Sequence, residues 1–177
     1  MPKSSVKKIE QDENKILNEL SKNATKSIND IAKSLGFSRQ KVWRIVKNLE
    51  DNKTIWGYIP VLDQEKLDRK SYILLVKRTN IPSKDTVINQ IVNRELVNEV
   101  SLIGIQVTNS FFTQGTFDWI ICFNAPNIRV AKNFVERFNK KYEGYVKETH
   151  LHQNIFPLVC SGITNPEIEK LKDFLKI

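Results

Sequence analysis

The sequence lacks most features of a metalloprotein or a disulfide-rich protein. Its two cysteines, Cys122 and Cys160, stand alone, with no Cys-x-x-Cys spacing and no group of metal ligands nearby. Isolated thiols of this kind are typical of a protein from a reducing compartment. We therefore expect a cytoplasmic protein that uses its cysteines neither for a metal site nor for a disulfide.

Long apolar runs and catalytic motifs are also absent. No stretch approaches the ~20 apolar residues that a transmembrane helix needs. Lys3, Lys7 and Lys8 near the N-terminus are not followed by the apolar core of a signal peptide. We find no Ser/His/Asp set, no paired carboxylates and no phosphate-binding loop. These absences predict a protein that is not an enzyme, holds no cofactor or metal and does not enter a membrane.

What the sequence does have is positive charge, unevenly placed. The 177 residues carry 28 Lys and Arg against 20 Asp and Glu, a formal net charge of +8. Residues 1–62 hold twelve basic and seven acidic side chains, a surplus of five on about a third of the chain. This balance suits a polyanionic partner, although charge by itself does not prove one.

Residues 27–53 have the spacing of a helix-turn-helix. Ser27, followed three residues later by an acidic side chain, marks the start of a short helix. Gly36 fits the turn after it, because glycine tolerates positive φ. Ser38 is a good N-cap for a second helix. One apolar stripe along that helix comprises Val42, Ile45, Val46 and Leu49.

The details of this segment favour DNA binding over an ordinary helical hairpin. Ala32 supplies the small side chain needed where two such helices cross, and Leu35 and Phe37 flank the turn as apolar plugs. Between Lys33 and Lys47 there are five basic residues and no acidic one. The alternative is an ordinary helical hairpin whose basic face is exposed to solvent. The small residue at the helix crossing, the glycine turn, the apolar plugs and the basic charge all agree with DNA binding instead.

The polar face of the second helix supplies the predicted contacts with double-stranded DNA. We expect Gln40 and Arg44 at base edges in the major groove, and Lys41 and Lys47 on phosphates. Ser38 adds a phosphate contact at the helix N-terminus. The full predicted set is Ser38, Arg39, Gln40, Lys41, Trp43, Arg44 and Lys47.

Two of these residues, and the N-terminus, have two open interpretations each. Arg39 contacts either a base or a phosphate, and Trp43 packs on the sugar backbone or covers the edge of the core. Residues 1–8 form a loose basic arm, either a disordered terminus or a minor-groove contact. An amphipathic helix over residues 12–22 completes a winged-helix-like, helix-turn-helix DNA-binding domain over residues 1–53.

Residues 54–70 are predicted to be a connecting strand and linker. Thr54–Leu62 is dominated by aromatic and β-branched residues, which favour a strand, and Pro60 indicates an edge or a bend in it. Residues 63–70 are polar and charged. The chain therefore changes from a helical domain to a second domain across this segment.

Residues 71–177 have the element order of a ferredoxin-like domain with a short C-terminal helix. We expect strands over residues 72–78, 107–113, 117–123 and 145–159. One helix, with Ser83 as a candidate cap, follows the first strand, and another follows Pro126-Asn127. Residues 99–106 could be the last turns of the first helix or the start of a strand. The order βαββαβ gives an α+β fold.

Three short segments carry a resemblance to a known family. Asp12–Leu17 looks like the family's acidic start to helix one, and Ile55-Trp56-Gly57-Tyr58 is similar to its Ile-x-Gly-Tyr. Gly115-Thr116-Phe117-Asp118-Trp119 is similar to its Gly-x-Tyr-Asp-Tyr. Over residues 10–158 the chain thus resembles the leucine-responsive regulatory protein family (Lrp/AsnC, feast/famine transcription regulators). The longer, more apolar segment 95–106 and the tail after Pro157 depart from the pattern.

The resemblance implies a sequence-specific transcription regulator controlled by a small-molecule effector, an amino acid or related metabolite. It implies a homodimer with paired connecting strands, and family members also form tetramers or octamers. The effector would lie near Gly115 and Asp118, with Thr149 lining the same cleft and Asp118 binding the ammonium group. From the residues alone, the favoured role of Asp118 is a turn residue that satisfies local backbone.

Two other functions stay open. His150 and His152 are two apart on a predicted strand, so they project to one face and could bind a metal or a haem. No Cys or carboxylate joins them at a suitable spacing, so a surface pair is the preferred interpretation. Some enzymes acting on modified tetrapyrroles share the regulator-like fold and are the runner-up. An effector-independent architectural DNA-binding protein is the third alternative.

Overall fold

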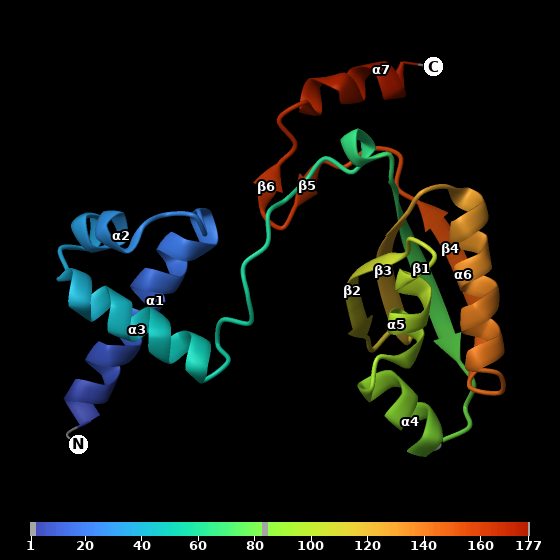
Figure 1. Ribbon diagram of the computed structural model, residues 1–177, viewed down its shortest axis with the longest axis horizontal. Coiled ribbons are helices and arrows are strands. Elements are labelled where there is room, and N and C mark those ends of the chain that lie inside the picture. Colours follow the sequence, from blue (N-terminus) through green and yellow to red (C-terminus); the bar gives the residue numbers. More distant parts are fainter. Residues whose placement is uncertain (1–2, 83–84, 177) are drawn as a thin grey trace. The chain divides into compact units, whose positions relative to one another are not determined.

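The chain divides into two compact units, Met1–Pro60 and Val61–Ile177, each with a hydrophobic core of its own (Figure 1). The computed structural model describes residues 3–82 and 85–176. The candidate cap Ser83 lies outside these residues. Within them, no helix combines the length and the apolar character needed to cross a membrane.

The first unit is built from three helices, α1 (Lys3–Lys22), α2 (Ile28–Leu35) and α3 (Arg39–Asp51). Residues 3–8 are therefore helical rather than a loose arm. No glycine or proline interrupts residues 3–11, so the helix extends toward the N-terminus. The predicted apolar stripe of α3 packs against α1 and α2, and the core consists of Ile16, Ile31, Ala32, Val42, Ile45, Val46 and Leu49.

The turn between α2 and α3 has the predicted local chemistry. The Ser27 hydroxyl caps α2 by accepting from the Asp30 N–H, and the Ser38 hydroxyl caps α3 by accepting from the Lys41 N–H. Gly36 has a φ of 66°, and its N–H closes the last turn of α2. These three residues end one helix and start the next within a few positions, which fixes the helix-turn-helix.

The predicted strand over Thr54–Leu62 does not form within the described chain. Ile55 closes the end of α3 through its N–H, 2.9 Å from the Leu49 carbonyl oxygen, and packs on the core. Trp56 beside it is 94% exposed. The residues beyond are irregular, because no neighbouring strand of the described chain offers them ladder hydrogen bonds. A single turn of 3₁₀ helix, Glu65–Leu67, follows.

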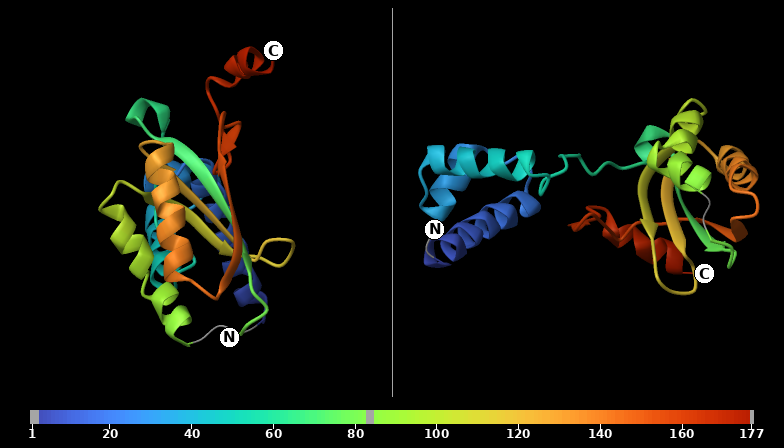
Figure 2. Two further views of the ribbon diagram at one scale, coloured as in Figure 1. Left: turned by 90° about the vertical axis from the view of Figure 1, so that its right-hand side faces the viewer. Right: turned by 90° about the horizontal axis from the view of Figure 1, so that it is seen from below.

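The second unit confirms the predicted βαββαβ order. Its sheet has the order β2-β3-β1-β4, with every neighbouring pair antiparallel. The helices α4, α5 and α6 lie on one face of this sheet (Figure 2). The elements are β1 (Lys70–Arg78), α4 (Asp85–Val92), α5 (Glu95–Ser101), β2 (Gln106–Phe112), β3 (Trp119–Ala125), α6 (Ile128–Lys141) and β4 (Val146–Gln153).

The segment left open in the sequence, residues 99–106, holds the end of a separate helix, α5 (Glu95–Ser101), and the first residue of β2, Gln106. Arg94 adopts a left-handed φ of 56° after α4 and redirects the chain. Leu96 and Val100 are buried in the sheet core. The apolar character of this segment therefore comes from one more helix covering the sheet.

The two faces of the sheet differ because side chains alternate along each strand. On β1, Tyr72, Leu74 and Val76 are buried under the helices. Their neighbours Ile73 and Leu75 point to the other face and are half-buried. The core residues lie on the face that the helices cover. Among the described residues, no helix or strand adds core side chains to the second face. We refer to it below as the open face.

The C-terminal tail departs from the predicted long strand. β4 ends at Gln153, and a separate hairpin follows, formed by β5 (Val159–Cys160) and β6 (Ile163–Thr164). Ser161 and Gly162 both have positive φ, 48° and 81°, as a tight two-residue hairpin turn requires. The expected C-terminal helix is present as a 3₁₀ turn (Ile168–Lys170) and α7 (Leu171–Leu175). The tail thus adds a hairpin, a 3₁₀ turn and a short helix to the βαββαβ domain.

Candidate nucleic-acid interface and effector site

The predicted DNA-reading face of α3 is exposed. Arg39, Gln40, Arg44 and Lys47 all point away from the core. Trp43 is 59% exposed, so it lies on this face rather than sealing the core edge. The buried stripe of the same helix holds the opposite side in place. α3 therefore presents two arginines, a glutamine and a lysine from one anchored helix.

Lys41 differs from the other basic residues of α3. Its Nζ lies 2.7 Å from Asp12 Oδ2 of α1 and 3.9 Å from the centroid of the Phe37 ring. Its side chain is 32% exposed and that of Asp12 only 12%. This ammonium is thus already paired within the unit, and a phosphate contact by Lys41 would compete with Asp12. No local pattern in the sequence indicates this partner, which lies 29 positions away.

Lys47 and Ser38 have weaker internal partners. Lys47 Nζ is 3.0 Å from Asp51 Oδ1, but both side chains are more than half exposed. The hydrogen bond to Asp51 raises the pKa of Lys47, so the side chain is a cation at neutral pH. Exposed pairs one helical turn apart contribute little stability, because solvent screens them. Lys47 can therefore exchange Asp51 for a phosphate at small cost. Ser38 accepts from the Lys41 N–H, and its own O–H is still able to donate.

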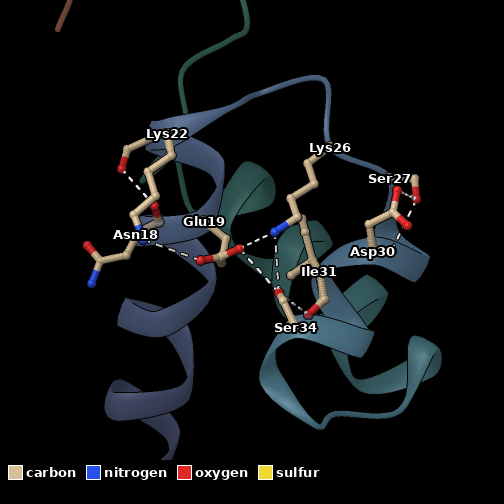
Figure 3. Close-up of polar contacts among 9 residues, drawn as sticks. Asn18, Glu19, Lys22, Lys26, Ser27, Asp30, Ile31 and Ser34 are labelled. Carbon is tan, nitrogen blue, oxygen red and sulfur yellow. Dashed lines mark hydrogen bonds and ion pairs between the residues drawn. The ribbon is translucent and has the colours of Figure 1, made fainter.

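A polar network fixes α2 against α1 (Figure 3). Lys26 Nζ lies between Glu19 of α1 and Ser34 of α2, and pairs with Glu19. Ser34 Oγ donates to Glu19 Oε2 over 3.2 Å. The hydrogen bond from Lys26 lowers the pKa of the Glu19 carboxyl. This network sets the crossing of the first two helices, on which the position of α3 depends.

The predicted effector residues Gly115 and Asp118 share the connection between β2 and β3. Gly115 is exposed, and an added Cβ would meet no atom within 4 Å. Asp118 Oδ2 accepts from the Arg78 backbone N–H over 2.9 Å, and its Oδ1 lies 3.5 Å from Arg78 Nε. Asp118 thus satisfies backbone, as the residues alone suggested, but on the neighbouring strand rather than in its own turn.

Thr149 is not brought into contact with Asp118. Val76 of β1 pairs with Trp119 on one side and with Thr149 on the other, so β1 separates the two candidates. Two strand spacings amount to about 9–10 Å. The Thr149 hydroxyl accepts from Asn139 Nδ2 of α6 over 3.1 Å. Arg78 is the neighbour of Asp118 that the sequence analysis missed, because only the strand register places it there.

The two histidines lie on β4, paired with residues of β1 that face the open side. His150 is opposite Leu75 and His152 opposite Ile73. The His150 ring packs edge-on against Phe117, with the centroids 5.3 Å apart. Within residues 3–82 and 85–176, no three His, Cys, Asp or Glu side chains are grouped so that they could hold a metal ion.

Comparison with known proteins gives a family similarity for the N-terminal unit. A family model described as winged helix-turn-helix DNA-binding matches residues 13–55. This range contains all of α2 and α3 and the second half of α1. The first unit is therefore similar to winged helix-turn-helix DNA-binding domains over residues 13–55. A comparison with curated protein sequences gives no significant match.

Solved structures extend the likeness to most of the chain. An AsnC family transcriptional regulator from Agrobacterium tumefaciens has a TM-score of 0.62 at 22% identity, over 84% of this chain and 91% of its own. The leucine response regulatory protein of Mycobacterium tuberculosis gives 0.65 at 14% identity, over 84% and 94%. A transcriptional regulator from Neisseria meningitidis, in complex with L-Met, gives 0.63 at 16% identity, over 86% and 94%. This chain has the Lrp/AsnC fold, and the resemblance seen in the sequence is confirmed at that level.

Proposed function

We propose that this protein is a sequence-specific transcription regulator that reads double-stranded DNA with α3. The observation that carries the proposal is the exposed polar face of that helix within a winged helix-turn-helix domain. Arg44 has no ion-pair partner among the described residues, so its guanidinium is available for a base edge. Arginine in the major groove pairs with guanine through two hydrogen bonds.

The proposed active form is a homodimer. A single recognition helix covers only a few base pairs, so useful specificity calls for two copies on a pseudo-palindromic operator, with half-sites about 34–36 Å apart or a multiple of that. Two surfaces of this chain are suited to a second copy. The connecting segment exposes Trp56, Ile59 and Leu62, and the open face exposes half-buried apolar side chains such as Leu75.

The proposed control is an amino acid or related metabolite bound in the second unit near Gly115 and Asp118. A similar fold has been solved in complex with L-Met, in the regulator from Neisseria meningitidis. Gly115, three residues before Asp118, has no atom within 4 Å of an added Cβ, so the turn is open at that position. An effector that binds two assembly states with different affinity shifts the balance between them, and with it the spacing of the paired recognition helices.

The direct test of DNA reading is selection of bound fragments from the source genome, followed by titration. We expect a recurring pseudo-palindrome bound at least ~10³-fold more tightly than random duplex at the same salt concentration. Footprinting should show two protected half-sites on one face of the DNA. Equal affinity for selected and random duplex would instead support an architectural protein.

The architectural alternative has one observation in its favour. Arg78 already provides Asp118 with a backbone donor and a nearby cation, so the carboxylate has a structural role without any ligand. A melting-temperature screen against the twenty amino acids separates the two functions, because a ligand that binds only the native state raises the melting temperature. A shift with any amino acid supports the sensor, and no shift supports the architectural protein.

A further inference from the structure

The helix α6 of the second unit carries a row of basic side chains on the side that points away from the sheet. Its opposite side, drawn against the sheet in Figure 2, is anchored by the buried residues Ala131, Phe134 and Phe138. Residues three and four positions apart share one side of a helix, so the exposed charged residues of α6 form one row. They are four cations and one carboxylate, and we call them the α6 stripe: Arg129, Lys132, Glu136, Arg137 and Lys140.

The cations of the α6 stripe lack internal partners. Among the described residues, none of the four forms an ion pair, although Glu136 lies one helical turn from Lys132 and from Lys140. The same unit pairs six other lysines with carboxylates, namely Lys66, Lys70, Lys77, Lys141, Lys170 and Lys172. The positive charge of the α6 stripe is therefore not used by the fold of this unit.

Two contacts at this helix keep the stripe available to a partner. Lys141 is on the side toward α5, with its Nζ 3.2 Å from Glu95 and 2.5 Å from Glu99, so these two carboxylates are neutralised away from the stripe. Arg137 Nε donates to Asn133 Oδ1 over 2.8 Å, which orients the guanidinium along the helix. Its Nη groups make no hydrogen bond among the described residues. A guanidinium presented in this way matches two oxygens of a phosphate.

We propose that the α6 stripe binds the phosphate backbone of double-stranded DNA, as a second contact in addition to that of α3. DNA carries one negative charge per about 1.7 Å of its axis, so a fixed row of cations is complementary to it. From Arg129 to Lys140 the helix rises roughly 16 Å, the length of about five base-pair steps. Phosphate contacts carry no sequence information. The inference therefore goes beyond the proposed function and does not depend on an operator.

The covalent link between the two units makes such a contact effective. Once α3 holds a duplex, the α6 stripe of the same chain meets further phosphates at an effective concentration of about 1 mM or more. A contact too weak to hold DNA by itself then adds to the affinity. The first unit already covers the phosphates beside α3, so the α6 stripe acts on the DNA that flanks the site.

The experiment is a fluorescence titration of the full chain at several salt concentrations on a short and a long duplex. The long duplex extends the selected site by about two helical turns at each end. Lys132→Gln combined with Lys140→Gln removes two cations of the stripe. On the long duplex it should flatten the salt slope by about two units, because each phosphate contact contributes about 0.9. On the short duplex the slope should stay as in wild type.

Lys170→Gln combined with Lys172→Gln is the matched control. It removes the same charge from the same unit, but these ammonium groups are paired with Glu167 and Glu169 in the tail. It should leave both slopes as in wild type. All four substitutions are at exposed positions, so thermal melting should not change.

Glu136→Gln provides the test of opposite sign, because it removes the only carboxylate of the α6 stripe. It should strengthen binding to the long duplex and not to the short one. Equal slopes for wild type and the Lys132/Lys140 variant on the long duplex would overturn the proposal. An equal loss in that variant and in the control would also overturn it, since net charge would then be the cause.

Failure here is distinguishable from failure of the proposed function. If a selected site is bound specifically and the stripe variant binds like wild type, the regulator stands and the α6 contact is wrong. If no sequence is preferred but the stripe variant flattens the slope on a long random duplex, the α6 contact stands and the sequence-specific regulator is wrong.

Discussion

Lys41 of the recognition helix is paired with Asp12 of the first helix, with 2.7 Å between Nζ and Oδ2. The pair holds the first turn of α3 against α1. It also occupies the ammonium group of Lys41, which the sequence analysis predicted to contact a DNA phosphate. Its main effect is therefore on the orientation of the helix. Breaking a buried pair costs about 3–5 kcal/mol, and the exposure of Lys41 reduces that to about 1–2 kcal/mol here.

The first prediction concerns this pair. Lys41→Met should destabilise the protein by about 1–2 kcal/mol in urea unfolding, because Asp12 is left without its cation. Asp12→Asn frees the ammonium, and we expect it to strengthen DNA binding at low salt and to steepen the salt dependence by about one unit. An unchanged salt slope in Asp12→Asn would show that Lys41 does not reach a phosphate even when it is released.

The second prediction separates base contacts from phosphate contacts on α3. Arg44→Ala should cost about 1–3 kcal/mol on the selected operator and relax its specificity. Lys47→Ala should weaken binding to all sequences alike and flatten the salt slope by about one unit. Fluorescence titrations on operator and random duplex at several salt concentrations measure both. Wild-type binding by Arg44→Ala would remove α3 from the recognition role.

The third prediction concerns pH. The hydrogen bond from Lys26 lowers the pKa of Glu19 below its usual 4.5, so the contact stabilises the folded state above that pH. The stabilisation is lost as pH falls through the folded pKa. Glu19→Gln should be less stable than wild type at neutral pH, and the difference should shrink below about pH 4. Melting curves from pH 3 to 7 test this, with Glu10→Gln on the same helix as control.

The fourth prediction concerns the turn of the helix-turn-helix. Gly36 has a φ of 66° and open space around it, so an added methyl group costs conformational energy rather than a clash. Gly36→Ala should destabilise by about 1–2 kcal/mol. Gly57→Ala is the control, because Gly57 has no positive φ and no atom within 4 Å of an added Cβ. Similar losses for both in urea unfolding would rule out the left-handed turn as the cause.

The fifth prediction concerns assembly. We expect a dimer in sedimentation at micromolar concentration, in which the segment 54–62 pairs with its twin. Ile59→Pro removes a backbone N–H that such a ladder needs and should weaken the dimer, whereas Ile59→Val keeps it and should not. A wild-type monomer would contradict the dimer. A dimer unaffected by Ile59→Pro would instead point to the open face, which Leu75→Lys would then disrupt.

Much of the fold could be predicted from the sequence because its signals are local. Ser27, Gly36 and Ser38 act on backbone groups within three or four positions, and so the two caps and the turn fall where expected. The periodicities of 3.6 and 2 located the helices and strands of both units. The exposed face of α3 followed directly, because the opposite stripe must be buried.

The pairings between residues that are far apart in the sequence were decided only by the tertiary structure. Asp12 and Lys41 are 29 positions apart, and Asp118 and the Arg78 backbone are 40 apart. No periodicity encodes such contacts, since they depend on how helices cross and on which residues of two strands face each other. The segment 54–62 shows the same limit of prediction from sequence. Its composition favours a strand, but a strand needs a partner for its hydrogen bonds, and within the described chain it has none.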